Sequence, residues 1–109
     1  MDYRIGHENK TCFTYVLPIN KRKALVEFTF FVPELVNDSI YDKKLEEFIS
    51  NTLHVDSYSI KEIEEGVIPM SSYSFWKDNN DRYIKIGTGG GWVKSSTGYS
   101  FKNTERKVA

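Results

Sequence analysis

The sequence lacks a net charge, because 15 basic residues balance 15 acidic ones over 109 positions. Proteins dedicated to nucleic acids carry a basic patch or stripe, so this balance argues against a nucleic-acid partner. The sequence also lacks an apolar run of the ~18 residues that span a membrane, and its N-terminus shows no signal-peptide pattern. With 39% hydrophobic residues, the chain is expected to fold as a globular protein.

Residues that form disulfides or bind metals are scarce. Cys12 is the one cysteine, which excludes an internal disulfide, and it is expected to be a small buried apolar side chain. His7 and His54 have no partners at a spacing that suits a zinc site or a catalytic triad, so no metal site is expected. The length allows a single domain over residues 1–109.

Aromatic residues are abundant, at 15% of the chain, and many lie in two β-rich runs. Residues 12–17 end at Pro18, and residues 24–32 end at Pro33. Two such runs joined by a short polar linker predict an antiparallel hairpin.

The second run carries one acidic residue, Glu27, in an otherwise apolar pattern. As a strand, it directs one wholly apolar face to the core and places Glu27 on the other face, between Leu25 and Thr29. Two interpretations remain open at this point. Glu27 lies in water on a half-exposed face, or its carboxyl group points into an apolar cavity where desolvation would raise its pKa.

Helical spacing follows the predicted hairpin, with an apolar side that includes Tyr41, Leu45 and Phe48. An amphipathic helix capped by Asp38 or Ser39 is therefore predicted to cover one face of the antiparallel sheet, which makes the fold class α+β. A third strand is predicted over residues 57–64 and a further hairpin around residues 77–86. The tail from Tyr99 onward predicts the start of a helix that is cut short.

A glycine-rich segment spans residues 87–91 (Gly-Thr-Gly-Gly-Gly). Its spacing matches neither the dinucleotide-binding fingerprint nor the P-loop. It is either a flexible loop or, since it precedes a predicted helix, a segment whose backbone N–H groups approach a phosphate or a flavin ring closely.

Five segments, in order along nearly the whole chain, together resemble the FAD-dependent lycopene cyclases of carotenoid synthesis. They are residues 1–4 (Met-Asp-Tyr-Arg), 13–18 (Phe-Thr-Tyr-Val-Leu-Pro), 24–29 (Ala-Leu-Val-Glu-Phe-Thr), 66–70 (Gly-Val-Ile-Pro-Met), and 86–91 with 96–101. The resemblance implies the substrate-facing sheet domain of a larger flavoprotein, an internal fragment without the N-terminal dinucleotide-binding unit and inactive alone. It further implies a non-redox, acid-initiated cyclisation of the ψ-ends of lycopene to β-ionone rings, with reduced FAD.

The resemblance also implies roles for individual residues. Glu27 is the expected catalytic acid, or the group that stabilises the carbocation, although Phe28 stands where the family often has a second carboxylate. The expected substrate contacts are Tyr15, Thr29, Pro69 and Met70. The expected FAD contacts are Gly87, Thr88, Gly89, Gly90, Thr97 and Gly98, although Thr88 and Ser95 replace an Asp and a Pro that are usual in flavoproteins.

Because lycopene resides in the bilayer, the resemblance implies a cytoplasmic enzyme associated peripherally with the inner face of the membrane; the fragment itself is expected to self-associate. Two other hypotheses remain. The chain is part of another FAD-dependent enzyme, of the geranylgeranyl reductase or hydroxylase type, or it is a freestanding α+β module that binds an apolar ligand or a protein.

Overall fold

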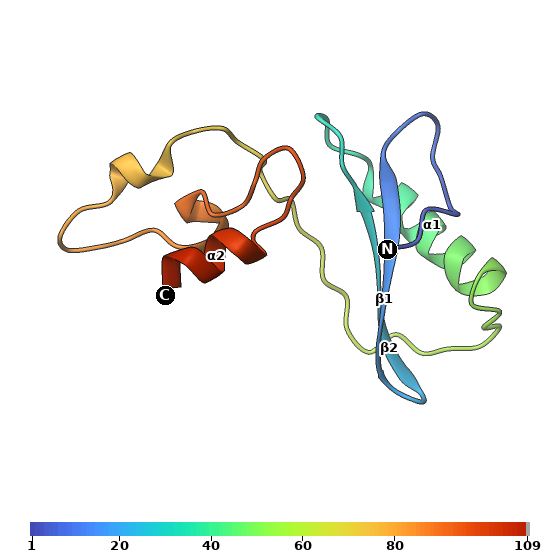
Figure 1. Cartoon of the computed structure of the whole chain (residues 1–109). Coiled ribbons are helices and arrows are strands. Elements are labelled where there is room, and N and C mark those ends of the chain that lie inside the picture. The colour runs from blue at the N-terminus through green and yellow to red at the C-terminus, as the bar shows by residue number, and fades with distance from the viewer. Residues whose placement is uncertain (109) are drawn as a thin grey trace. The chain divides into compact units, whose positions relative to one another are not determined.

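The chain is an α+β protein, as its sequence predicts, in a computed structural model that describes residues 1–108 (Figure 1). The contacts divide the chain into two compact units, Met1–Lys61 and a second unit that starts at Glu62. Within the described residues both strands lie in the first unit, and the second contains short helices joined by long loops.

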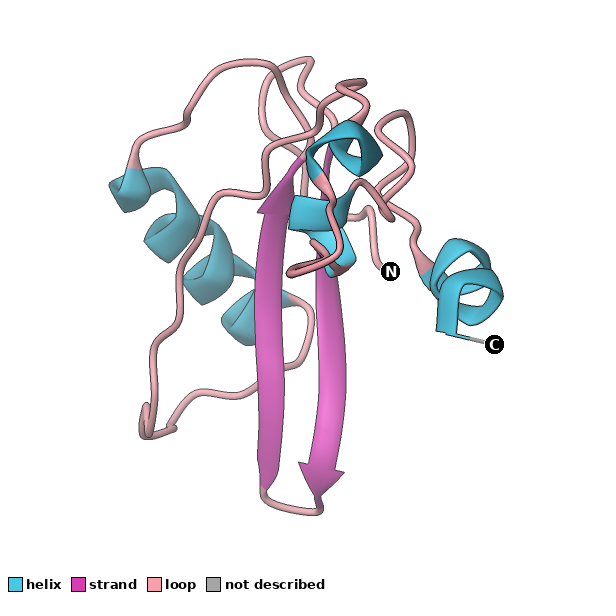
Figure 2. Cartoon of the chain, turned by 90° about the vertical axis from the view of Figure 1, so that its left-hand side faces the viewer, coloured by secondary structure: helices cyan, strands magenta, loops and turns pink. Residues whose placement is uncertain are grey.

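The first unit is built on an antiparallel hairpin of β1 (Cys12–Asn20) and β2 (Lys23–Phe30), seen in Figure 2. The backbone N–H of Arg22 donates to Oδ1 of Asn20 at 2.8 Å and closes the turn. This confirms the hairpin predicted from the two β-rich runs.

Strand β1 continues through Pro18, where the sequence predicts its end. The N–H of Thr14 points away from β2, since it donates to the carbonyl of Asp2 at 2.8 Å. Strand geometry gives every second residue the same orientation, so the nitrogen of Pro18 also faces away from β2. Proline at this position removes no hydrogen bond between the strands.

Helix α1 (Asp38–Asn51) confirms the predicted amphipathic helix. Its N-cap is Asn37, one residue before the predicted caps, because the Asn37 side chain accepts the N–H of Ser39 at 3.0 Å. The helix packs on one face of the hairpin, and Phe48 at its centre is only 1% exposed.

The core of the first unit lies between α1 and the hairpin. It consists of Ile5, Cys12, Phe28 and Phe48, and Phe30 and Tyr41 pack beside it with ring centroids 5.2 Å apart. Phe28 and Phe30 therefore confirm that the apolar face of β2 is the core face, and Cys12 is buried as expected.

The second unit contains η1 (Phe75–Asp78), η2 (Gly87–Gly90) and α2 (Phe101–Val108). Helix α2 confirms the predicted tail helix, whose last residue, 109, lies outside the described residues. The strands predicted over residues 57–64 and 82–86 are wrong: these segments are extended or looped, with one isolated bridge between Asn80 and Tyr83. Alternating residues form a strand only where another strand is available to pair, and neither segment has such a partner within residues 1–108.

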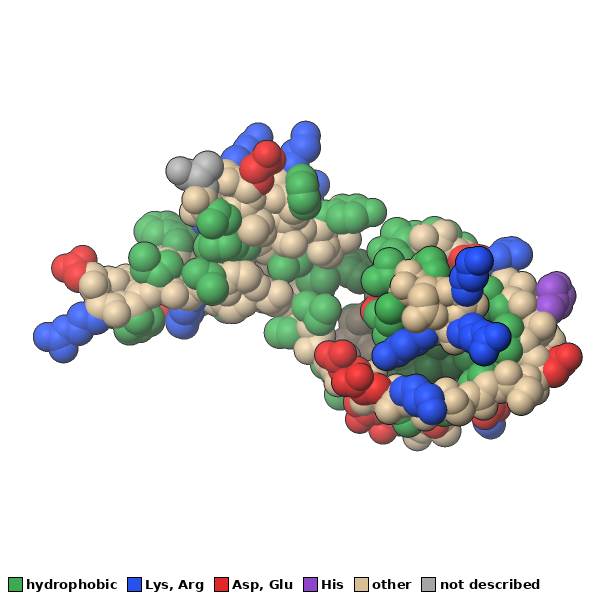
Figure 3. All heavy atoms as spheres, turned by 90° about the horizontal axis from the view of Figure 1, so that it is seen from below, with side chains coloured by type: hydrophobic (Ala, Val, Ile, Leu, Met, Phe, Trp, Pro, Cys, Tyr) green, Lys and Arg blue, Asp and Glu red, His purple; other side chains and the backbone are tan. Residues whose placement is uncertain are grey.

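Large hydrophobic side chains reach the surface in both units (Figure 3). In the second unit, Gly90 is the one buried residue of the part that the structure describes. Exposed apolar surface on this scale is typical of surfaces that bind ligands, membranes or other protein parts.

Candidate functional site

The face of the hairpin opposite α1 carries the first group of candidate residues. Its cross-strand pairs are Phe13 with Thr29, Tyr15 with Glu27, and Leu17 with Leu25. Since paired residues project to the same side of a sheet, the hairpin brings Tyr15, Glu27 and Thr29 together. Leu17 and Leu25 are 61% and 50% exposed, so this face is an open apolar surface.

Glu27 is the one carboxylate among these six side chains, and it is exposed. Its Oε1 accepts a hydrogen bond from the Thr29 hydroxyl at 2.8 Å. No lysine or arginine within residues 1–108 forms an ion pair with it. The sequence left two possibilities for Glu27, a half-exposed sheet face or an enclosed apolar cavity. In the first unit, its carboxyl group lies on a half-exposed face.

Phe28, the neighbour of Glu27, projects to the opposite side. It is 6% exposed in the core against α1, at the position where the resemblance leads one to expect a second carboxylate. A carboxylate there would face the core of this unit rather than the open apolar face. Glu27 is therefore the acidic group that β2 presents on the candidate face.

The N-terminal segment extends this face with aromatic rings that sequence reasoning did not assign to it. Asp2 and Thr14 form a β-bridge with two backbone hydrogen bonds of 2.8 Å, which places Tyr3 beside Phe13. The ring centroids of Tyr3 and Phe13 are 5.7 Å apart, and those of Phe13 and Tyr15 are 5.3 Å apart. The result is a row of three rings that leads to the Tyr15–Glu27 pair.

In the second unit, Met70 and Gly98 lie together although 28 positions separate them in the sequence numbering. A Cβ on Gly98 would lie 3.2 Å from Cε of Met70, and Gly98 has a positive φ of 74°. Gly98 thus both completes its turn and accommodates the methionine. A residue expected at the substrate and one expected at the cofactor are therefore neighbours here. Pro69 and Met70 are both exposed.

The glycine segment forms a tight turn rather than a flexible loop. The N–H groups of Gly90, Gly91 and Trp92 donate to carbonyls of residues 86–88 at 3.0 Å. Gly87 and Gly91 need glycine for their positive φ, and a Cβ on Gly90 would overlap the carbonyl of Lys85.

Gly89 differs from the other glycines of this turn. Its φ is not in the left-handed region, and a Cβ on it would meet nothing within 4 Å. The fold of the described chain therefore gives no reason for glycine at this position. Close approach of a bound group to the backbone gives such a reason, so the turn fits the flavin contact that the resemblance implies.

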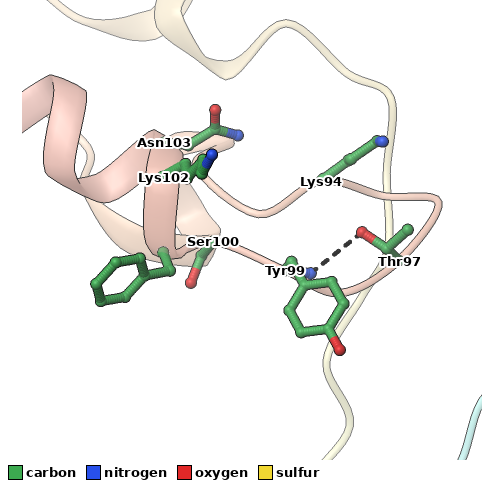
Figure 4. A pocket seen from close by; sticks show the side chains of 7 residues that line it. Lys94, Thr97, Tyr99, Ser100, Lys102 and Asn103 are labelled. Atoms are coloured by element: carbon green, nitrogen blue, oxygen red, sulfur yellow. Dashed lines mark hydrogen bonds between the residues drawn. The ribbon is translucent and has the colours of Figure 1, made fainter.

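A hollow of about 470 Å³ lies between the turn at residues 94–99 and the start of α2 (Figure 4). The N–H of Tyr99 donates to Oγ1 of Thr97 at its rim, and Lys94 and Lys102 contribute positive charge. Of the expected cofactor contacts, this hollow contains Thr97 and none of the residues 87–90. Its complete lining is Lys94, Thr97, Tyr99, Ser100, Phe101, Lys102 and Asn103.

Residues 1–108 contain no group of three or more His, Cys, Asp or Glu side chains arranged to hold a metal ion. None of their helices has the length and apolar character needed to cross a membrane.

These observations define an α+β protein that presents a single carboxylate on an aromatic sheet face and a tight glycine turn on a second unit. The family model described as lycopene cyclase protein matches residues 1–109, and the chain belongs to this family. Membership indicates an enzyme with a role in carotenoid cyclisation. Searches of curated proteins and of solved structures gave no significant match.

Proposed function

We propose that this chain carries part of the active site of an enzyme that cyclises the ψ-ends of lycopene to β-ionone rings without net oxidation or reduction. The observation that carries this proposal is the cross-strand pair of Tyr15 and Glu27 on an open apolar face. A hydrocarbon substrate needs apolar surface for binding and an acid for activation, and this face combines the two.

The proposed reaction begins with proton transfer from the Glu27 carboxylic acid to the terminal carbon–carbon double bond of the substrate. The resulting tertiary carbocation is attacked by a neighbouring double bond, which forms the ring bond and moves the positive charge into the ring. Transfer of a ring proton to the Glu27 carboxylate converts the C–H electron pair into the β-ionone double bond and regenerates the acid. The product is an isomer of the substrate, so atoms and electrons balance.

The aromatic row beside Glu27 supports this chemistry. Faces of aromatic rings attract cations within about 6 Å of the ring centroid. Tyr15 is paired with Glu27, and Phe13 lies 5.3 Å from Tyr15 between centroids, so both rings can border a carbocation formed at the carboxyl group. The Thr29 hydroxyl, which donates to Glu27, orients the carboxylate toward this face.

The glycine turn and the Thr97–Gly98 turn are proposed to contact FAD. Gly87, Thr88, Gly89 and Gly90 would present backbone to the flavin, and Gly89 leaves the space that close approach requires. Thr97 lies in a hollow with Lys94 and Lys102, which suits an electronegative edge or a phosphate. A bound reduced flavin would supply an electron-rich ring, with no net electron transfer.

The remaining proposals concern the cellular location at which the enzyme binds its substrate. Lycopene is dissolved in the bilayer, so the enzyme is proposed to associate peripherally with the inner face of the cytoplasmic membrane. The exposed apolar side chains of both units support this proposal (Figure 3). Pro69 and Met70, which are exposed, are proposed as substrate contacts.

The test is expression of the complete gene that encodes this chain in a host that accumulates lycopene. The expected result is a change of colour from red to orange-yellow, with a product of the same mass as lycopene by mass spectrometry. A product that is heavier by hydrogen or oxygen atoms would indicate a reductase or hydroxylase instead. An unchanged pigment profile would contradict the cyclase proposal.

A further inference from the structure

A cluster of polar side chains in the second unit holds the chain just before the glycine turn. The Tyr73 hydroxyl donates to Oδ1 of Asp78 at 3.0 Å, and Nζ of Lys85 donates to Oδ2 of the same carboxylate at 2.8 Å. Both carboxylate oxygens of Asp78 are therefore engaged. The Lys85 and Tyr73 hydrogen bonds hold the pKa of Asp78 below its usual range, so the carboxylate is charged at neutral pH.

Lys85 connects this cluster directly to the turn. Its backbone N–H donates to Oδ1 of Asn79 at 3.0 Å, and its carbonyl lies where a Cβ on Gly90 would stand. The N–H of Gly90 donates to the carbonyl of Ile86 at 3.0 Å, so Gly90 is held against residues 85 and 86. Lys85 is therefore in direct contact with the turn.

The other end of the turn also contacts the η1 segment. A Cβ on Gly91 would lie 3.0 Å from Cδ2 of Phe75, which indicates that the Phe75 ring packs on the Gly91 backbone. The ring of Tyr73 stands edge-on to Phe75, with 5.0 Å between centroids. Residues 73–78 thus support the glycine turn at both ends, and the segment between η1 and η2 forms the long orange loop in Figure 1.

We propose that Asp78 is a positioning residue, which fixes the backbone of the glycine turn through Lys85 for close approach of a bound flavin. The inference rests on the proposed function insofar as the turn is taken to face the cofactor. Because the Lys85 ammonium is bound to Asp78, Lys85 serves to hold the turn and is not the group that binds an anion. The face of the turn at Gly89 remains open for the cofactor.

The experiment compares Asp78→Asn with the wild type in the complete protein, purified with and without FAD. In the flavin-free protein, amide hydrogen exchange of Gly90, Gly91 and Trp92 is expected to become at least about fivefold faster, since local opening exposes these N–H groups. The dissociation constant of FAD, measured by flavin fluorescence, is expected to rise about tenfold, because the turn then occupies its binding-competent position less often.

Matched variants separate positioning from general destabilisation. Asp81→Asn removes an exposed carboxylate three positions away and is expected to change neither measurement. Asp78→Glu keeps the charge and is expected to restore much of the affinity. Tyr73→Phe removes one hydroxyl and tests the cluster even where Asp78→Asn fails to fold.

The possible outcomes distinguish this inference from the proposed function. Unchanged exchange and unchanged FAD affinity in Asp78→Asn would overturn the positioning role, as would a lower melting temperature with unchanged affinity. If the wild type binds no FAD but exchange at residues 90–92 still accelerates, the support of the turn stands and the cofactor proposal fails.

Discussion

Tyr15 and Glu27 face each other as a registered pair across the β1–β2 hairpin, on the side that α1 does not cover. The pairing register decides this relationship, because a shift by one residue would turn Glu27 into the core beside Phe48 and expose Phe28 instead. The hairpin therefore determines that the acidic side chain of β2 is the accessible one.

The first prediction concerns Glu27→Gln. General acid catalysis contributes about 10²- to 10⁴-fold to a rate, so cyclisation is expected to fall at least about 100-fold while the fold is retained. The measurement is the ratio of β-carotene to lycopene in the lycopene-accumulating host. Glu46→Gln, which changes an exposed carboxylate on α1, is the matched control and is expected to leave the ratio unchanged. Normal β-carotene output from Glu27→Gln would remove Glu27 from the mechanism.

The second prediction separates two adjacent glycines. Gly89→Ala is expected to keep the melting temperature of the wild type, because its Cβ enters open space, and to weaken FAD binding. Gly90→Ala is expected to destabilise the second unit, because its Cβ overlaps the carbonyl of Lys85. Thermal unfolding and flavin titration of both variants provide the test. Equal FAD affinity of Gly89→Ala and wild type would exclude a flavin at this part of the turn.

The third prediction concerns the buried hydroxyl of Thr14. This side chain is 1% exposed, and within the described residues its Oγ1 has no hydrogen-bond partner. An unsatisfied buried polar group costs about 1–3 kcal/mol, so Thr14→Val is expected to raise the free energy of unfolding by about 1 kcal/mol. Thr14→Ser keeps the hydroxyl, loses the methyl group and is expected to lower it. Denaturant unfolding measures both, and a less stable valine variant would show that the hydroxyl is bonded.

The fourth prediction concerns the core of the first unit. Phe48→Ala is expected to lower the free energy of unfolding by about 3–5 kcal/mol, because Phe48 is 1% exposed and its removal leaves a cavity against the hairpin. Phe101→Ala makes the same chemical change at a residue that is 79% exposed, and a change within about 0.5 kcal/mol is expected. Similar losses in the two variants would contradict the packing of α1 on the hairpin.

The fifth prediction concerns the acid side of the pH range. The hydrogen bonds and charge of Arg4 lower the pKa of Asp2 from 3.8 to about 2. The folded state therefore binds fewer protons than the unfolded state between these values, and the stability that the pair contributes is complete above about pH 4 and lost as the pH falls through about 2. Arg4→Gln removes the guanidinium but keeps the backbone N–H that donates to Oδ1 of Asp2, so the pKa of Asp2 is expected to rise part of the way towards 3.8, measured by carboxyl NMR titration. An unchanged titration of Asp2 in this variant would show that Arg4 is not the cause.

The sequence by itself determined the elements whose signals are local. The alternation of residues 24–32 and the linker before them predicted the hairpin, and the spacing of Tyr41, Leu45 and Phe48 predicted α1. The same alternation predicted which side of β2 is core and which carries Glu27. Local periodicity suffices in these cases because each segment must bury one face, and the nearest neighbour in the chain supplies the partner.

The tertiary structure decided what depends on contacts between distant positions. Alternation at residues 57–64 predicted a strand that does not form. A strand needs a second strand to pair with, and the alternation of one segment does not show whether such a partner is present. Three contacts join segments that no local pattern in the sequence relates to one another. They are the β-bridge between Asp2 and Thr14, the contact of Met70 with Gly98, and the hydrogen bond from Lys85 to Asp78. The sequence identified Glu27 as the acid of its strand, whereas only the fold showed the aromatic row beside it and the support beneath the glycine turn.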